Sequence, residues 1–351
     1  MIGLAYIGLS CISSHITSKV FINDELSEVI QQTFDNRNKS IIQKDLKTLK
    51  SLYDTNTKLG TWAYEHQENK MKYLYKWAEK QGIKFIDIKS KFTARRLNEK
   101  DTKLSAYLTV STEYKYFYEN DPETVNFFRI GTYHSLAMIN IDEQWFITKE
   151  WYTDPFADSL HLDDIKTEEI KTYILSSEPR DFLNINERRI NAVEYADRYC
   201  GAAADEEYGY VFNKKYRNYN PLGGDCANFA SQILHEGGKF KKTHTWNYDS
   251  DGSKAWVNAQ AFKDNMIYSG RASLIAYGTY QKIHKSAYKL IPGDFVGYEK
   301  KGKVTHISVV TGADSKGYTL VNCHNTDRYR VPWDLGWSDK GIKFWLVRVH
   351  Y

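Results

Sequence analysis

Residues 223–234 read GGDCANFASQIL. The two glycines are typical of a tight turn, and Asp225 is of a type that caps helices by accepting backbone hydrogen bonds. From Phe229 the apolar residues recur at helical spacing until a glycine pair at 237–238 ends the pattern. We therefore expect a buried helix that begins at Cys226. Free N–H groups and the positive end of the macrodipole favour thiolate there, which predicts a nucleophile. A free cysteine is also often just a small buried residue.

The chain on either side of this stretch predicts a helix followed by a sheet. Residues 190–200 form a helical pattern that ends at a glycine, and a second helical pattern starts near Trp256. The remaining segments read as strands, at 292–298, 306–310, 318–324 and 343–349. A helix that carries cysteine, followed by an antiparallel sheet that carries histidine at a strand start, resembles papain-like thiol enzymes.

In the N-terminal half, helical patterns come first and strand patterns follow. Helical spacing covers residues 25–56 and continues from Gly60 to Gly82, after which the pattern changes to period two. Strands are expected at 83–92, 104–110, 127–141 and 145–152. Helices followed by an antiparallel meander predict an α+β fold with helices on a curved sheet. The order of elements resembles cystatin-like or nuclear-transport-factor-like domains. We place this domain at 25–155, an acidic linker with a short helix at 156–186, and the papain-like domain at 187–351.

Composition excludes several classes of protein. The chain has 351 residues, a net charge of +4 and no arginine-rich run, so nucleic-acid binding is not expected. Its four cysteines show no CxxC spacing and no paired Cys/His pattern, which argues against a metal site, and no cofactor is expected. Residues 1–14 are apolar, too short to span a bilayer and without a basic start. We interpret residues 1–20 as a truncated export signal and expect an extracytoplasmic location.

Amide hydrolysis by a thiol needs an imidazole to carry the proton and a polar group to orient that imidazole. His306 begins an apolar strand 80 residues after Cys226 and is the best candidate for the base. The orienting residue should lie on the next strand, where the register decides among Asn322, His324 and Asn325. For the oxyanion we consider the backbone N–H of Cys226 and, in a supporting role, the side chains of Asn228 and Gln232.

The resemblance becomes specific when the motifs are taken in order. They are AVEYADRYC, GGDCANFASQILHEGG, AWVNAQAF, IPGDFVGY, THISVVTG and CHNTDR. Over residues 187–350 this order resembles a bacterial putative amidase domain family, which is similar to CHAP-type cysteine amidases and peptidases. The resemblance implies Cys226 as nucleophile, His306 as base and His324 as third residue, with Asn322 in that role in some related families. It also implies an amide substrate in cell-wall peptidoglycan, or another peptide, and association with the wall surface.

Two other functions fit the same residues. The 27 tyrosines, 9 tryptophans and a basic C-terminal half fit a wall- or peptide-binding module that keeps the fold without turnover. Transglutaminase-like transfer of an acyl group onto an amine would use the same thiol and imidazole.

Overall fold

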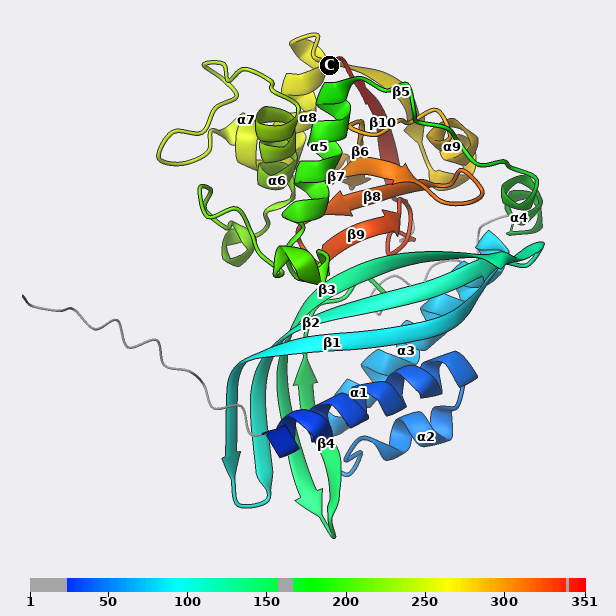
Figure 1. Cartoon of the computed structure of the whole chain (residues 1–351), viewed down its shortest axis with the longest axis vertical. Helices are drawn as coiled ribbons and strands as arrows, with labels where there is room; N and C mark the ends of the chain where they lie inside the picture. Colours follow the sequence, from blue (N-terminus) through cyan, green and yellow to red (C-terminus); the bar gives the residue numbers. More distant parts are fainter. Residues whose placement is uncertain (1–23, 157–166, 339–340) are drawn as a thin grey trace, which may run out of the picture.

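The computed structural model describes residues 24–156, 167–338 and 341–351 (Figure 1). Helices come first in the chain, and the predicted helical stretch 25–56 is interrupted at Lys44, which has a φ of +56°. These elements are α1 (Asp24–Gln43), α2 (Leu46–Ser51) and α3 (Lys58–Gln81). The antiparallel strands that follow are β1 (Ile83–Lys100), β2 (Lys103–Tyr118), β3 (Asp121–Ile141) and β4 (Gln144–Trp151). The expected order of helices and then a curved antiparallel sheet is confirmed.

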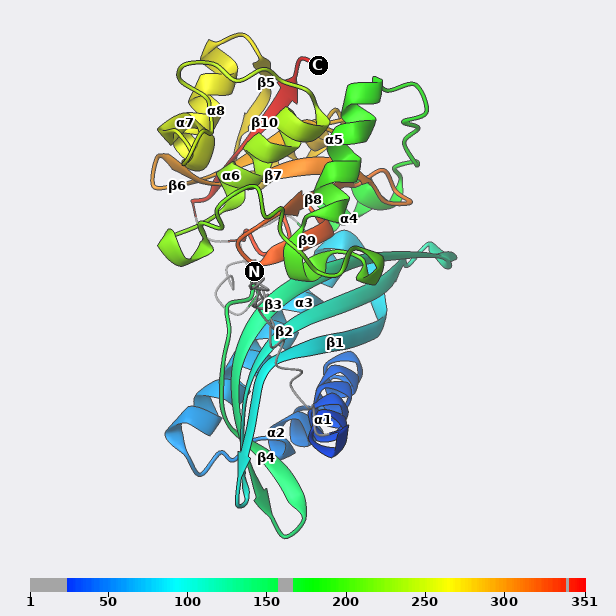
Figure 2. The same ribbon diagram turned by 60° about the vertical axis from the view of Figure 1, so that its left-hand side comes forward.

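The C-terminal half contains the predicted helices and strands and three elements that the sequence patterns did not predict. Its helices are α4 (Thr167–Leu175), α5 (Glu187–Arg198), α6 (Cys226–Gln232), α7 (Lys254–Val257), α8 (Ala259–Tyr268) and α9 (Tyr280–Ala287). Its strands are β5 (Ala272–Gly278), β6 (Phe295–Lys300), β7 (Lys303–Ala313), β8 (Thr319–Cys323), β9 (Asp327–Pro332) and β10 (Lys343–Val349). The unpredicted elements are β5, α9 and β9. Figures 1 and 2 show α5 and α6 over β7 and β8.

One sheet runs through both halves of the described chain. Its strand order is β1-β2-β3-β9-β8-β7-β6-β10-β5, with β4 also paired to β3. The halves meet where β3 pairs with β9, with Gly131 opposite Asp327. A side chain at Gly131 would lie 2.6 Å from the backbone of Ala202, so only glycine fits. Beside this pair, the Tyr133 hydroxyl donates a 2.8 Å hydrogen bond to the Asp327 carboxylate. The predicted boundaries at 155 and 187 therefore lie within a body whose sheet is continuous.

The hydrophobic core under this junction is also shared. Trp77 and Phe128 of the N-terminal half belong to the same buried cluster as Trp333 and Phe344. At its edge the carboxylate of Asp334 accepts hydrogen bonds from four buried side chains, which are Lys80, the Trp77 indole at 3.2 Å, the Tyr318 hydroxyl at 2.7 Å and the Gln81 amide at 3.5 Å. An unpaired carboxylate at this depth would be costly, so these bonds fix α3 against the C-terminal half.

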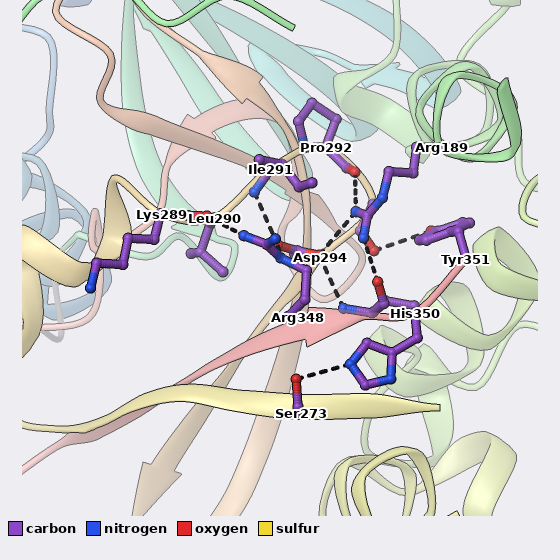
Figure 3. A network of polar contacts seen from close by, with 12 residues as sticks. Arg189, Ser273, Lys289, Leu290, Ile291, Pro292, Asp294, Arg348, His350 and Tyr351 are labelled. Atoms are coloured by element: carbon purple, nitrogen blue, oxygen red, sulfur yellow. Dashed lines mark hydrogen bonds and ion pairs between the residues drawn. The ribbon is translucent and has the colours of Figure 1, made fainter. Parts of the chain in front are cut away.

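A second buried network fixes the last strand to α5 (Figure 3). The Arg189 guanidinium donates to the carbonyls of Pro292 and Val349 and, at 2.9 Å, to the Asp294 carboxylate. Asp294 also accepts from Nε of Arg348, at 2.7 Å. Because Asp294 precedes β6 while Val349 ends β10, the network fixes two neighbouring strands that lie behind the candidate site.

The α+β class is confirmed. Among the described residues, none of the helices has the length and apolar character needed to cross a membrane. The predicted export signal at 1–20 lies outside the described residues, as does part of the linker.

Candidate active site

The glycine turn and the helix start are where the sequence predicted them. Gly223 and Gly224 have φ values of +108° and +140°, which L residues rarely adopt, and α6 begins at Cys226. A Cβ on Gly224 would lie 2.3 Å from Nδ2 of Asn325, so this glycine also allows a close approach. The turn therefore brings the segment before Cys226 against the β8–β9 connection.

The carboxylate of Asp225 does not cap the helix, contrary to the expectation from sequence. It accepts hydrogen bonds from the backbone N–H of Tyr219 at 2.9 Å, from Nδ2 of Asn228 at 2.8 Å and from Nδ1 of His324 at 2.5 Å. The physical reason is that the buried imidazole of His324, whose pKa is raised by this contact, is a stronger partner than a neutral backbone N–H. Asp225 consequently joins the loop before the helix to the end of β8.

Cys226 is 6% exposed, and burial raises the pKa of its thiol to about 12. Contacts with the backbone of Ile307 and Ala227 favour the thiolate but are outweighed by desolvation. The expected lowering of this pKa by the helix N-terminus is therefore not found in the structure without substrate. The contact with Ile307 does place the sulfur beside β7, one residue after His306.

His306 is buried, with its ring centroid 4.9 Å from that of Trp337 and 5.5 Å from that of Tyr298. Its Nε2 atom has no hydrogen-bond partner among residues 24–156, 167–338 and 341–351. Burial, followed by the positive charges of Arg328 and Lys300, holds the pKa of His306 well below its usual value. The imidazole is therefore neutral and can accept a proton.

Cys226 and His306 lie at the same end of β7 without a hydrogen bond between them. The Ile307 side chain packs in the same hydrophobic cluster as Cys226. The His306 ring instead packs against Tyr298, which belongs to the core that the two halves share. Alternation along a strand explains this difference. In structures without substrate, hydrogen bonds of catalytic groups are often long or unformed.

His306 opens onto a cleft of about 910 Å³ between the two halves of the chain. The C-terminal half contributes the turn at 218–224, the β8–β9 connection and Trp337, and the N-terminal half contributes β3 and the segment after β4. The residues that line the cleft include Arg95, Tyr133, Asp154, Gly223, Gly224, Lys300, His306, Asn325, Arg328 and Trp337. Cys226 is not one of these lining residues. It follows the turn at 218–224 and contacts β7, and both of these segments line the cleft.

Of the three candidates for the orienting role, only Asn325 lines this cleft. Both ring nitrogens of His324 are engaged, Nδ1 with Asp225 and Nε2 with the Tyr199 carbonyl at 2.8 Å. The Asn322 amide is bonded to Asp197, Thr311 and the N–H of Arg330. Asn322 is thus bonded to Asp197 of α5, and the His324 ring stacks on Phe229 of α6, so neither side chain is bonded to His306.

Asn325 is also bonded to the turn that precedes the cysteine. Its Oδ1 accepts a 2.6 Å hydrogen bond from the N–H of Asp225, and its Nδ2 lies against Gly224. Its φ of +69° is one that asparagine tolerates better than most residues.

The two side chains considered for the oxyanion have other partners. Oδ1 of Asn228 accepts from the Trp256 indole at 2.9 Å, while its Nδ2 donates to Asp225 and to the Arg217 carbonyl. Oε1 of Gln232 accepts from the Tyr195 hydroxyl at 3.0 Å. Both residues are buried, and their hydrogen bonds hold α6 in place.

Sequence reasoning missed Arg328, Trp337 and the N-terminal wall of the cleft. Arg328 stands in the quoted motif CHNTDR, yet nothing in the spacing marks it as a lining residue. Tyr133 and Arg95 reach the site only through the pairing of β3 with β9, which has no local sequence signal.

The C-terminal half is similar to known proteins. Residues 186–347 match the model of a family described as "Putative amidase domain". A Bacillus subtilis (strain 168) protein named "Uncharacterized protein YhbB" is 29% identical over 153 residues, which cover 41% of this chain and 43% of that protein. The matched region thus spans less than half of the relative. No solved structure matches this chain, so the papain-like and N-terminal fold resemblances stay predictions. What the comparisons support is an amide-hydrolysing role for residues 186–347.

Proposed function

We propose that this protein is a cysteine amidase or peptidase that hydrolyses an amide bond in the cleft between its two halves. The observation that carries the proposal is that Cys226 begins a buried helix beside β7, while the neutral imidazole of His306 opens onto the adjoining cleft from the same strand. The amidase-family match supports the reaction class.

The reaction starts from a thiol and a neutral imidazole. As Sγ of Cys226 bonds to the amide carbonyl carbon, His306 accepts the thiol proton. The resulting imidazolium protonates the leaving amine when the C–N bond breaks, which leaves a thioester. Water, deprotonated by His306, then attacks the thioester, releases the carboxylic acid and restores the thiol. Since the structure has no hydrogen bond between Cys226 and His306, the imidazole must turn toward the sulfur for this proton transfer.

The oxyanion needs donors at the start of α6. In the described part of the chain, the N–H of Cys226 has no hydrogen-bond partner, as expected for the first residue of a helix. Nδ2 of Asn325 is adjacent to Gly224 and lines the cleft. We assign these two N–H groups to the oxyanion and make Asn325, rather than His324, the third polar residue of the site.

For the substrate we propose peptidoglycan, either its stem peptides or the amide that joins sugar to peptide, with the protein acting outside the cytoplasm. This part rests on the motif resemblance over residues 187–350. Purified cell walls incubated with wild-type protein should release new amino groups, and Cys226→Ala should release none. Equal release from both proteins would disprove cysteine catalysis. Incorporation of a labelled amine without free acid would instead indicate acyl transfer.

A binding module without turnover is the second candidate. The observations that favour it are the high pKa of the Cys226 thiol and the absence of a hydrogen bond between that thiol and His306. Cell walls that retain wild-type and Cys226→Ala protein equally, without product release by either, would establish this reading.

A further inference from the structure

Arg328 is a buried cation that lines the cleft and, in the described parts of the chain, has no carboxylate partner. It is 2% exposed, and its Nη1 donates to the Leu335 carbonyl at 2.7 Å. Its Nε atom has no hydrogen-bond partner, and among the described residues no carboxylate forms an ion pair with it. Buried arginines are usually paired, because desolvating a guanidinium without an acceptor is costly. Within the described residues, the guanidinium therefore lacks an anionic acceptor and could receive one from a ligand.

The surroundings fix this guanidinium in place. Its carbon lies 5.4 Å from the ring centroid of Trp337, and its Nη2 would lie 3.1 Å from a Cβ on Gly336. Arg328 also lies near the proposed base, because its charge contributes to lowering the pKa of His306, after burial. An anion bound to Arg328 would consequently sit within reach of the proposed reaction centre.

A second arginine faces the same cleft from the N-terminal sheet. The Arg95 guanidinium lies 5.0 Å from the Tyr133 ring centroid, and its Nε donates to the Thr109 hydroxyl at 2.7 Å. Lys300 also lines the cleft. The lining carboxylate, Asp154, is already paired with His66 at 3.2 Å and Lys70 at 3.7 Å. Among the described lining residues, arginines therefore lie on both walls of the cleft, Arg328 on one and Arg95 on the other.

We propose that this cleft is a carboxylate-binding subsite, in which Arg328 and Arg95 hold a free carboxylate of the amide substrate. The inference deepens the proposed function and rests on it for the reaction. It defines the substrate as a peptide or acyl amino acid whose free carboxylate lies close to the scissile amide. Arginine suits the task because its planar fork can bind both carboxylate oxygens. The proposed subsite also gives the N-terminal half, through Arg95, a direct part in substrate recognition.

The test compares two ligand libraries that differ only in charge. Full-length Cys226→Ala protein is incubated with an equimolar library of N-acetyl dipeptides as free acids and with the same library as C-terminal carboxamides. Retained compounds are identified by mass spectrometry, and dissociation constants follow by calorimetry. We expect the acids to bind about tenfold more tightly than the matching carboxamides. Equal binding of acids and carboxamides, or retention of neither, would overturn the proposal.

Matched variants locate the subsite. Arg95→Gln should weaken binding of the acid several-fold and leave carboxamide binding unchanged. Arg96→Gln is the control, since it removes the same charge from the next residue but borders a different hollow. Arg328→Lys keeps a charge but loses the fork and should cost about tenfold for the acid alone. Because Arg95 is exposed, its variant remains informative if Arg328→Lys fails to fold. Equal effects of the Arg95 and Arg96 variants would contradict the assignment.

Failure of this inference and failure of the proposed function are distinguishable. Selective binding of acids by Cys226→Ala, with no hydrolysis by the wild type, would retain the subsite and refute the amidase. Hydrolysis of acids and carboxamides at equal rates would retain the amidase and refute the subsite.

Discussion

Nδ1 of His324 lies 2.5 Å from a carboxylate oxygen of Asp225, the residue immediately before Cys226. Nε2 of the same ring faces the carbonyl of Tyr199, and the ring stacks on Phe229 with centroids 3.7 Å apart. Both nitrogens face acceptors, so the ring carries two protons and is an imidazolium. A buried ion pair therefore fixes the position of the candidate nucleophile.

Removing either member of this pair should destabilise the protein strongly. His324→Gln leaves Asp225 buried without its cation, and loss of one partner of a buried pair typically costs about 3–5 kcal/mol. We expect a similar loss for Asp225→Asn and a double variant that is less destabilised than the sum of the two. Urea unfolding followed by tryptophan fluorescence measures these free energies. Asp249→Asn, at an exposed position, serves as the control. Additive effects would show that the two side chains do not interact.

The same pair makes stability depend on pH in a defined direction. Asp225, and to a smaller extent Asp327, raise the pKa of His324 above its usual value in spite of burial. A histidine with a raised folded-state pKa contributes its full stabilisation below the unfolded pKa of about 6.5 and loses it as pH rises through the folded value. The difference in unfolding free energy between wild type and His324→Gln should therefore be largest near pH 6 and decrease toward pH 9. A difference that grew with pH would contradict the assignment.

The thiol and imidazole should behave as a neutral pair in the absence of substrate. Because burial raises the pKa of Cys226 to about 12, its alkylation by iodoacetamide should be slow at pH 7 and should accelerate up to pH 10 and above. Mass spectrometry of the labelled peptides separates Cys226 from the buried Cys200 and Cys323. Fast alkylation already at pH 6 would instead show a preformed thiolate–imidazolium pair.

Activity should persist in mildly acidic solution. The proposed base must be neutral to accept the thiol proton, and the pKa of His306 is lowered, first by burial and then by Arg328. The acid limb of kcat/KM should therefore lie below pH 6.5. Removing the positive charge by Arg328→Gln should shift this limb to higher pH, as measured in a pH–rate profile. An unchanged limb would exclude His306 as the group that titrates.

Local pattern was enough to locate the cysteine helix and the histidine strand, since both follow from turn residues and apolar periodicity around Cys226 and His306. The roles of His324 and Asn325 could not be read in the same way. They are adjacent in sequence, and their different environments follow from the strand register and from a left-handed turn at Asn325. The pKa of Cys226 was misjudged because burial depends on tertiary packing, which a helix-start motif does not encode.

The cleft itself was beyond sequence reasoning. Its N-terminal wall exists because Gly131 pairs with Asp327 across nearly 200 positions, and the lack of a carboxylate partner for Arg328 among the described residues follows only from the tertiary structure. A polar motif such as CHNTDR indicates a site at a strand end, but does not separate Arg328 from Arg330, which pairs with Asp197.

The two glycines before Cys226 provide a matched pair of substitutions. Both have positive φ, so alanine at either should cost about 1 kcal/mol or more through backbone strain. A Cβ at Gly223 meets nothing within 4 Å, whereas at Gly224 it would meet Asn325. Gly223→Ala should therefore lose stability with little loss of turnover, and Gly224→Ala should in addition displace Asn325 and reduce kcat. Thermal unfolding and cell-wall digestion, run in parallel, measure the two effects. Equal turnover by both variants would remove Asn325 from the site.

The two halves should unfold as one unit, although the family match covers only the second. Separating them would leave β9 without β3, expose the shared core around Trp77 and Trp333, and leave the buried carboxylate of Asp334 without Lys80. We therefore expect residues 187–351 expressed alone to be aggregated or loosely packed, with weak near-ultraviolet circular dichroism. Full-length protein should show one urea transition that is the same by fluorescence and by circular dichroism.

Lys80→Met tests the junction in the intact chain. Burial lowers the pKa of Lys80, and its partner Asp334 would remain buried with only neutral donors. We expect a loss of about 3 kcal/mol in one transition that both halves share, because the removed contact belongs to a common core. Lys72→Met, which removes only an exposed ion pair with Glu68 on the same helix, is the matched control. Two separate transitions in Lys80→Met, or a stable folded 187–351 fragment, would show that the halves are independent. In that case the C-terminal half would fold without the N-terminal wall of the cleft, and the site would not depend on that wall for its structure.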